Sequence, residues 1–175
     1  MNFEEKKLEG KTVFSGKILS VDVDKVELPD GRESFRECIR HHGGAAVLFI
    51  EDGKVLLVKQ YRYVYGKEIY EIPAGKLEVG EPPEKAAARE LNEETGIVAE
   101  ELVRMFCLYP SPGYTDEVIH VFRVGKYRKA EQKLDEGEFL DIEFKEIGEV
   151  LEMIEDGRIC DAKTVAAVYG YLGGC

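Results

Sequence analysis

The sequence predicts an α/β fold in which a mixed β-sheet lies between two layers of helices. Segments with strand-like patterns and three amphipathic helical segments are distributed along the whole chain rather than grouped by type. That order is typical of layered α/β domains. The chain has 175 residues and 44% hydrophobic content, which is enough for one domain with a substantial core.

The N-terminal residues predict a β arm. Residues 12–40 read as strands, and residues 21–28 alternate apolar and polar side chains with the period of two that a strand requires. Pro29-Asp30-Gly31 is a strong turn signal, and a second strand follows through about Arg40. We therefore divide the chain into a β arm, residues 1–40, and a main domain, residues 41–175.

The next segments predict central, buried strands. The apolar run 45–50 and the returning strand 55–61 flank a turn over 51–54, and together they favour a β-hairpin. A short strand over about 68–72 leads into Pro73-Ala74-Gly75.

A helix is predicted over about residues 82–95. Pro82 and Pro83 suit a first turn, and Gly96 suits a left-handed stop just past the end. Asp161 is a good N-cap for a later helix. The remaining elements are expected in this order: strands over 102–109 and 118–124, a polar and mobile loop over 125–137, a strand over 139–144, and helices over 147–156 and 162–172.

Three acids share one face of the helix over 82–95. Glu90, Glu93 and Glu94 are spaced i, i+3 and i+4, and they crowd the C-terminal half, where the helix dipole disfavours negative charge. A divalent cation is the simplest compensation, and ligands that are all oxygen select magnesium, manganese or calcium over zinc. Taken alone, the three glutamates also fit a solvated acidic helix face in a chain with 35 acidic residues.

The surrounding residues favour the cation site. The segment fits Gly-x5-Glu-x7-Arg-Glu-aliphatic-x-Glu-Glu-x-Gly-aliphatic, and chance matching of its seven strictly fixed positions is roughly one start in a hundred million. The matching residues are Gly75, Glu81, Arg89, Glu90, Leu91, Glu93, Glu94, Gly96 and Ile97. The chain thus resembles the Nudix hydrolases. The resemblance implies a Nudix-type α/β/α sandwich with a mixed sheet, and an enzyme that cleaves nucleoside diphosphates linked to a further group.

The resemblance also implies a set of metal ligands. Glu90 and Glu94 would be the principal ligands, Glu93 would share or bridge, and the backbone carbonyl of Ala74 would complete the set. The expected cofactor is Mg²⁺, with Mn²⁺ as a possible substitute.

The other signature residues are expected to be structural, with a role as a metal ligand as the alternative for Glu81. Arg89 would pair with an acid such as Glu81 rather than touch the substrate, while Gly75 and Gly96 would shape the two loops.

The general base is expected outside the signature helix. The chain resembles the ADP-ribose pyrophosphatase subfamily, whose members carry a glutamate on a loop late in the sequence. Glu136 is the first candidate and Glu138 the second, with Glu93 as a third. The alternative is that these residues form an acidic loop that is exposed to solvent and has no catalytic role.

Three further features resemble that subfamily and suggest substrate contacts. Pro112, followed by Gly113, lies sixteen positions after Gly96, where it would shape the wall beside the terminal ribose. Arg62 would contact the diphosphate, although a salt bridge to Glu68 or Glu71 is the alternative. The N-terminal strands resemble a dimerising arm, in which Arg36 would reach the partner subunit's substrate.

The sequence therefore predicts a cytoplasmic, domain-swapped homodimer that hydrolyses ADP-ribose to AMP and ribose 5-phosphate. The alternatives are hydrolysis of another nucleotide sugar, such as ADP-glucose or GDP-mannose, and a non-catalytic module that binds ADP-ribose. A net charge of −11 argues against nucleic-acid binding, and no apolar run approaches the ~18 residues of a membrane span. The N-terminus also lacks the apolar core of a signal peptide.

Overall fold

A computed structural model describes residues 2–134 and 137–175 of the chain. These residues form two compact units, which we describe one at a time. The first comprises the chain up to residue 43 together with residues 109–118, and the second comprises residues 44–108 and 119–175. The division of the sequence at residue 40 stays a prediction.

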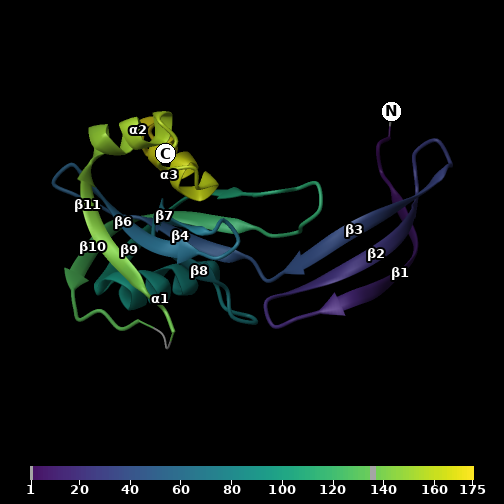
Figure 1. Cartoon of the computed structure of the whole chain (residues 1–175), viewed down its shortest axis with the longest axis horizontal. Helices are drawn as coiled ribbons and strands as arrows, with labels where there is room; N and C mark the ends of the chain where they lie inside the picture. The colour runs from purple at the N-terminus through teal and green to yellow at the C-terminus, as the bar shows by residue number, and fades with distance from the viewer. Residues whose placement is uncertain (1, 135–136) are drawn as a thin grey trace. The chain divides into compact units, whose positions relative to one another are not determined.

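The first unit is an antiparallel sheet of strands β1 (Lys6–Ser15), β2 (Leu19–Glu27) and β3 (Glu33–His41), in the order β1-β2-β3 (Figure 1). The strand β1 begins six residues earlier than the predicted start of strand structure at residue 12. Every residue of β1 is exposed, so its sequence lacks the clear alternation that burial of one face produces.

The second unit holds two sheets. One has the order β8-β4-β10-β9, and the other has the order β11-β6-β5 with β7 paired to β6. The strands are β4 (Gly44–Leu48), β5 (Ile50–Glu51), β6 (Lys54–Arg62), β7 (Lys67–Glu71), β8 (Ala74–Lys76), β9 (Ile97–Leu108), β10 (Ile119–Lys129) and β11 (Leu140–Glu146). Because β4 and β10 are parallel while the other pairs are antiparallel, the strands are mixed as predicted.

The predicted hairpin between residues 45–50 and 55–61 is largely wrong. The strand β4 pairs with β8 and β10, and only the two residues of β5 pair with β6. The chain leaves one sheet and enters the other at Phe49, a buried residue whose carbonyl accepts the Leu56 N–H at 3.0 Å. A two-residue strand after a continuous apolar run gives no pattern that would reveal this change of sheet.

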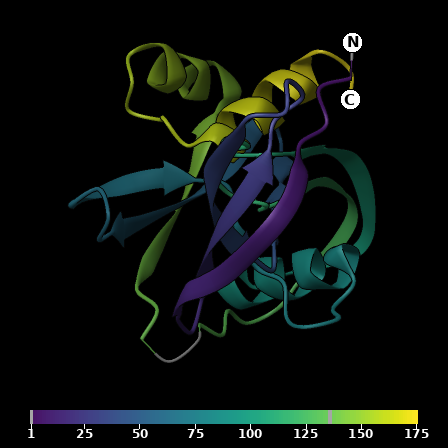
Figure 2. The ribbon, with the colours of Figure 1, turned by 90° about the vertical axis from the view of Figure 1, so that its right-hand side faces the viewer.

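The helices lie on both sides of these strands, as the α/β/α prediction requires. The helix α1 (Pro83–Thr95) is on one side, and α2 (Ile147–Glu155) and α3 (Ala162–Leu172) are on the other (Figures 1 and 2). Strands β4 and β6 are buried on both faces because alternate residues enter two different cores. The core beneath α1 contains Ala45, Val47, Phe49, Leu56, Val58, Ala86, Ala87, Leu91, Ile97 and Phe122. The core beneath α2 and α3 contains Ala46, Leu48, Val55, Leu57, Ile72, Val121, Val150, Met153, Ile159, Ala167 and Val168.

The loop predicted over 125–137 is wrong for its first part, because β10 continues to Lys129. Register shifts on both sides of Lys126 interrupt the alternation, which is why the sequence reads as a loop. Tyr127 anchors the extension: its ring packs edge-on against Phe49 with centroids 4.8 Å apart, and its hydroxyl bonds to Glu51. In the described ranges, 2–134 and 137–175, no helix combines the length and apolar character needed to cross a bilayer.

Leu91 tests the core beneath α1. Its side chain is completely buried, so Leu91→Ala should lower the free energy of unfolding by about 2–5 kcal/mol through lost burial and an added cavity. Urea unfolding monitored by circular dichroism measures the change. Val79→Ala, at a residue that is 87% exposed, is the control. Equal effects of the two substitutions would contradict the role of Leu91.

Candidate functional site

The ends of α1 fix the positions of its acids. Pro82 is the N-cap, with φ −62° and ψ 135°, and Gly96 ends the helix in the left-handed conformation at φ 71°. The Gly96 N–H donates to the Asn92 carbonyl at 2.9 Å. The helix therefore starts and stops where the sequence predicts, and its three neighbouring acids share one face.

That face packs closely against the strand β8. A Cβ atom on Gly75 would lie only 1.9 Å from Cδ of Glu90, so no larger residue fits there without displacing the glutamate. Glu94 is held from the same strand, because its Oε2 accepts the Ala74 N–H at 3.0 Å. Gly75 thus lets the Glu90 carboxylate lie directly against the backbone of β8.

One guanidinium links three of the acids. Arg89 donates twice to Glu81, at 3.1 and 3.0 Å, and once each to Glu90 Oε1 at 2.8 Å and Glu93 Oε2 at 3.0 Å. It also donates to the carbonyl of Lys76 at 3.2 Å, which ties the loop to the helix. The bonds from Arg89 lower the pKa of Glu81. Arg89 therefore orients the carboxylates and is a local countercharge for them.

The negative charge of the cluster exceeds what Arg89 neutralises. Glu94 is 3% exposed, and burial, followed by the charge of Glu90, raises its pKa to about 8 against the opposing bond from Ala74. Burial also raises the pKa of Glu90. The charge of Glu138, an exposed residue, adds to both shifts. Glu94 stays charged at neutral pH only if further positive charge arrives.

The donor set fits a hard divalent cation. One oxygen of each of Glu90, Glu93 and Glu94 is bonded to Arg89 or Ala74, and the other has no donor among the residues that the structure describes. Oxygen ligands of this kind suit Mg²⁺ or Mn²⁺. Within those same residues, no group of three or more histidines, cysteines or acids is spaced to hold a metal ion in this arrangement. The glutamate side chains would therefore have to move closer to one another when a cation binds.

A second charged network lies beside the acids. Glu71, which is 2% exposed, accepts from Arg62 at 2.6 and 2.9 Å and forms an ion pair with Lys163. Lys163 also pairs with Asp161 at 2.9 Å. The alternative reading of Arg62, a salt bridge to Glu71, is what the structure contains, and the acid lies in the interior. Glu68 pairs with Lys59 instead.

This network holds the segment before Gly75. Asp161 caps α3 by accepting from the Thr164 N–H at 3.0 Å, and it accepts from the Thr164 hydroxyl at 2.6 Å. Thr164 Oγ1 in turn accepts the Ile72 N–H at 2.9 Å. Residues 72–74 are therefore bonded to α3 at one end and to Glu94 of α1 at the other.

The N-cap at Asp161 was predicted from the sequence, whereas Glu71, Lys163 and Thr164 were not predicted as site residues. The signal available in the sequence was Glu71, a charged residue at the end of the strand that leads into Ile72.

The remaining predicted site residues lie either in the first unit or outside the described residues. Glu136 lies outside the described residues. Arg36, Pro112 and Gly113 belong to the first unit, where Arg36 bonds to Glu5 at 2.8 Å. Their contribution to substrate binding stays a prediction.

Comparison with known proteins identifies the class to which this fold and acid cluster belong. A family model described as the NUDIX domain matches residues 40–168, which is most of the chain. The protein therefore belongs to the Nudix hydrolase family. A second model, described as the nucleoside diphosphate sugar hydrolase N-terminal domain, matches residues 5–39.

Two relatives and one solved structure show which members of the family this chain is similar to. A Bacillus subtilis (strain 168) protein named ADP-ribose pyrophosphatase is 44% identical over 170 residues, covering 95% of this chain and 92% of its own. A Bacillus methanolicus protein named methanol dehydrogenase activator is 45% identical over 169 residues, which cover 95% of this chain and 91% of that protein. A crystal structure titled as an ADP compounds hydrolase superposes with a TM-score of 0.86 over 99% of this chain and 95% of its own. At 22% identity, that likeness shows the shared fold.

The raised pKa of Glu94 predicts a pH-dependent stability in the cation-free protein. Between its ordinary pKa near 4.5 and about 8, the folded state keeps the proton and the unfolded state loses it. Rising pH therefore favours unfolding across that range, and the free energy of unfolding should fall until about pH 8. Glu94→Gln should flatten this fall. Urea unfolding with chelator at several pH values measures it, and parallel wild-type and variant curves would contradict the assignment.

Thr164 tests the anchoring of residues 72–74. Its side chain is fully buried, and Thr164→Val leaves the Ile72 N–H without its acceptor. We expect a loss of about 1–3 kcal/mol in the free energy of unfolding together with a lower kcat. Thr164→Ser keeps the hydroxyl and is the matched control. If the serine variant loses as much activity as the valine variant, the hydrogen bond is not responsible.

Proposed function

We propose that this protein is an Mg²⁺-dependent ADP-ribose pyrophosphatase that hydrolyses ADP-ribose to AMP and ribose 5-phosphate. The observation that carries this proposal is the 44% identity to a protein of that name over 95% of the chain. The match of residues 5–39 to a domain of nucleoside diphosphate sugar hydrolases supports the same substrate class.

The acid cluster supports the use of a divalent cation in this reaction. Glu90, Glu93 and Glu94, with the carbonyl of Ala74, are the groups that would hold it. When bound, the cation supplies positive charge that offsets the charge of the phosphate oxygens and polarises phosphorus. Mn²⁺ is the expected substitute, because it prefers the same oxygen ligands.

The chain's own residues position the ligands and move the proton. Arg89 fixes one oxygen of Glu90 and one of Glu93, while the Ala74 N–H fixes one oxygen of Glu94. A general base then takes a proton from the attacking water as the anhydride bond breaks. Glu136 is the first candidate for this role, Glu138 the second and Glu93 the third. The negative charge of Glu138 acts on both Glu90 and Glu94.

The substrate contacts are also part of the proposal. Arg62 is 41% exposed in its side chain, and Glu71 holds its Nε and Nη2, so Nη1 is the nitrogen that would contact the diphosphate. Arg36, Pro112 and Gly113 would bind the substrate in a homodimer whose N-terminal arms, residues 1–40, exchange between subunits. The main domain in this arrangement is residues 41–175.

A substrate panel tests the proposal. The purified protein is incubated with Mg²⁺ and ADP-ribose, ADP-glucose, GDP-mannose, NADH or diadenosine polyphosphates, and the products are separated by chromatography. We expect ADP-ribose to give the highest kcat/KM, with AMP and ribose 5-phosphate as products. Preference for GDP-mannose would overturn the substrate assignment. Binding of ADP-ribose without turnover of any compound would instead indicate a non-catalytic module.

Substitutions separate the ligands from the base. Glu90→Gln and Glu94→Gln should each lower kcat and raise the Mg²⁺ concentration needed for half-maximal activity. Among Glu93→Gln, Glu136→Gln and Glu138→Gln, the variant of the base should lose about 10²-fold or more in kcat with little change in KM. Glu84→Gln, an exposed acid on the same helix, is the control. Near-normal rates for all three candidates would exclude a carboxylate base from this set.

A further inference from the structure

Arg62 is the last residue of β6, and its side chain turns back along its own strand. In the hairpin of β6 and β7, Arg62 lies opposite Lys67. The carboxylate that binds its guanidinium belongs to Glu71, which lies opposite Val58. Val58 precedes Arg62 by four residues, or about 13 Å along a strand. The guanidinium is therefore drawn away from the exposed turn of the hairpin and toward residues 72–74.

Glu71 is held from a second side by Lys163 of α3. The Lys163 ammonium pairs with Oε2 of Glu71 and, at 2.9 Å, with Oδ1 of Asp161. Burial raises the pKa of Glu71, but the bonds from Arg62 and the charge of Lys163 outweigh it and hold that pKa below its ordinary value. Glu71 is therefore a carboxylate in the interior, and its position is tied to the start of α3.

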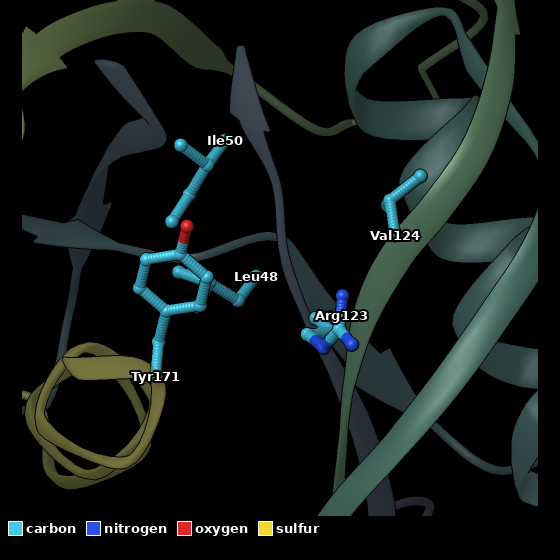
Figure 3. Close-up of a pocket in the computed structure, with 5 residues that line it drawn as sticks. All are labelled: Leu48, Ile50, Arg123, Val124 and Tyr171. Carbon is cyan, nitrogen blue, oxygen red and sulfur yellow. The ribbon is translucent and has the colours of Figure 1, made fainter. Parts of the chain in front are cut away.

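Stability alone does not account for this pairing. The desolvation of a buried ion pair offsets much of its attraction, and apolar residues of similar volume are often as stabilising. Figure 3 shows Arg123 of β10 at a hollow whose other lining residues, Leu48, Ile50, Val124 and Tyr171, carry no carboxylate. The buried Nε of Arg123 has no hydrogen bond to any residue that the structure describes. An arginine of this unit can thus fold without an acid, and the pairing of Arg62 with a buried one requires another explanation.

The pairing leaves one edge of the Arg62 guanidinium free. Glu71 accepts from Nε at 2.6 Å and from Nη2 at 2.9 Å, and within residues 2–134 and 137–175 the guanidinium donates to no other group. The free edge, formed by Nη1 and Nη2, presents two parallel N–H groups that match two phosphate oxygens. The bonds from Glu71 raise the pKa of Arg62, and the charge of Glu94 adds to that shift. The guanidinium is therefore within electrostatic reach of the acid cluster.

We propose that Glu71 and Lys163 are positioning residues for the binding of a diphosphate. Glu71 holds one edge of Arg62 so that the free edge faces the substrate, and Lys163 fixes Glu71 through α3. Neither residue touches the substrate. This inference rests on the proposed function for the substrate class, a nucleoside diphosphate linked to a sugar, and adds the residues that act through Arg62.

A double-mutant cycle tests whether Lys163 acts through Arg62. The ligand is α,β-methylene ADP-ribose, an analogue whose phosphorus–carbon bridge resists hydrolysis, and its Kd with Mg²⁺ is measured by calorimetry on the full chain. We expect Arg62→Ala to weaken binding by about 10-fold or more, and Lys163→Met by a smaller factor. The double variant should bind no more weakly than Arg62→Ala. Additive losses, or unchanged binding by Lys163→Met, would overturn the proposal.

A second cycle and a control complete the test. Glu71→Gln keeps the size of the side chain, and in place of Lys163→Met it should give the same non-additive result with Arg62→Ala. This cycle decides the question if Lys163→Met does not fold. Lys59→Met removes the Lys59–Glu68 ion pair of the same hairpin and should leave the Kd unchanged.

Turnover of ADP-ribose is measured on the same proteins, and the losses should appear in KM rather than in kcat. A non-additive cycle without turnover by the wild type would refute the enzymatic function and support the positioning role. Normal turnover with additive losses would refute the positioning role alone. If the wild type does not bind the analogue, both proposals are wrong.

Discussion

The packing of helix α1 against the three-residue strand β8 is the contact on which the rest of the site depends. It brings the Glu90 carboxylate so close to the backbone at Gly75 that a larger residue there would displace it, and it places Glu94 within hydrogen-bond distance of the Ala74 N–H. Glu94 is buried as a result, and Glu90 is largely shielded from solvent. The close packing of α1 against β8 therefore also buries the charge of Glu94. That burial is the reason why Glu94 requires positive charge from outside the chain.

Arg89 lowers the electrostatic cost of bringing these acids together. A single guanidinium reaches Glu81, Glu90 and Glu93, so it reduces the repulsion among acids that helical spacing places together. It leaves one oxygen of Glu90 and one of Glu93 without a bond from it. The site is thus partly neutralised by the chain itself, and the deficit is concentrated at Glu94, the acid that Arg89 does not touch.

Local chemistry made part of this structure predictable. The bounds of α1, the left-handed Gly96, the cap at Asp161 and the positions of α2 and α3 all depend on residues close together in the sequence. The change of sheet at Phe49, the extension of β10 through Tyr127 and the bond from Ile72 to Thr164 depend on partners far away in the chain. For the same reason the signature acids could be placed on one helix face, while the Glu71–Lys163 pair that supports the neighbouring loop could not.

The segment 72–74 is bonded on one side to α3 and on the other to α1, and these helices cover opposite faces of the strands. Its position therefore depends on the thickness of both core layers. A side chain that is too large or too small in either core changes the spacing between the two anchors, even when it lies far from any acid. Core packing on both faces of the strands therefore bears on the geometry of the segment beside the acids as well as on the stability of the fold.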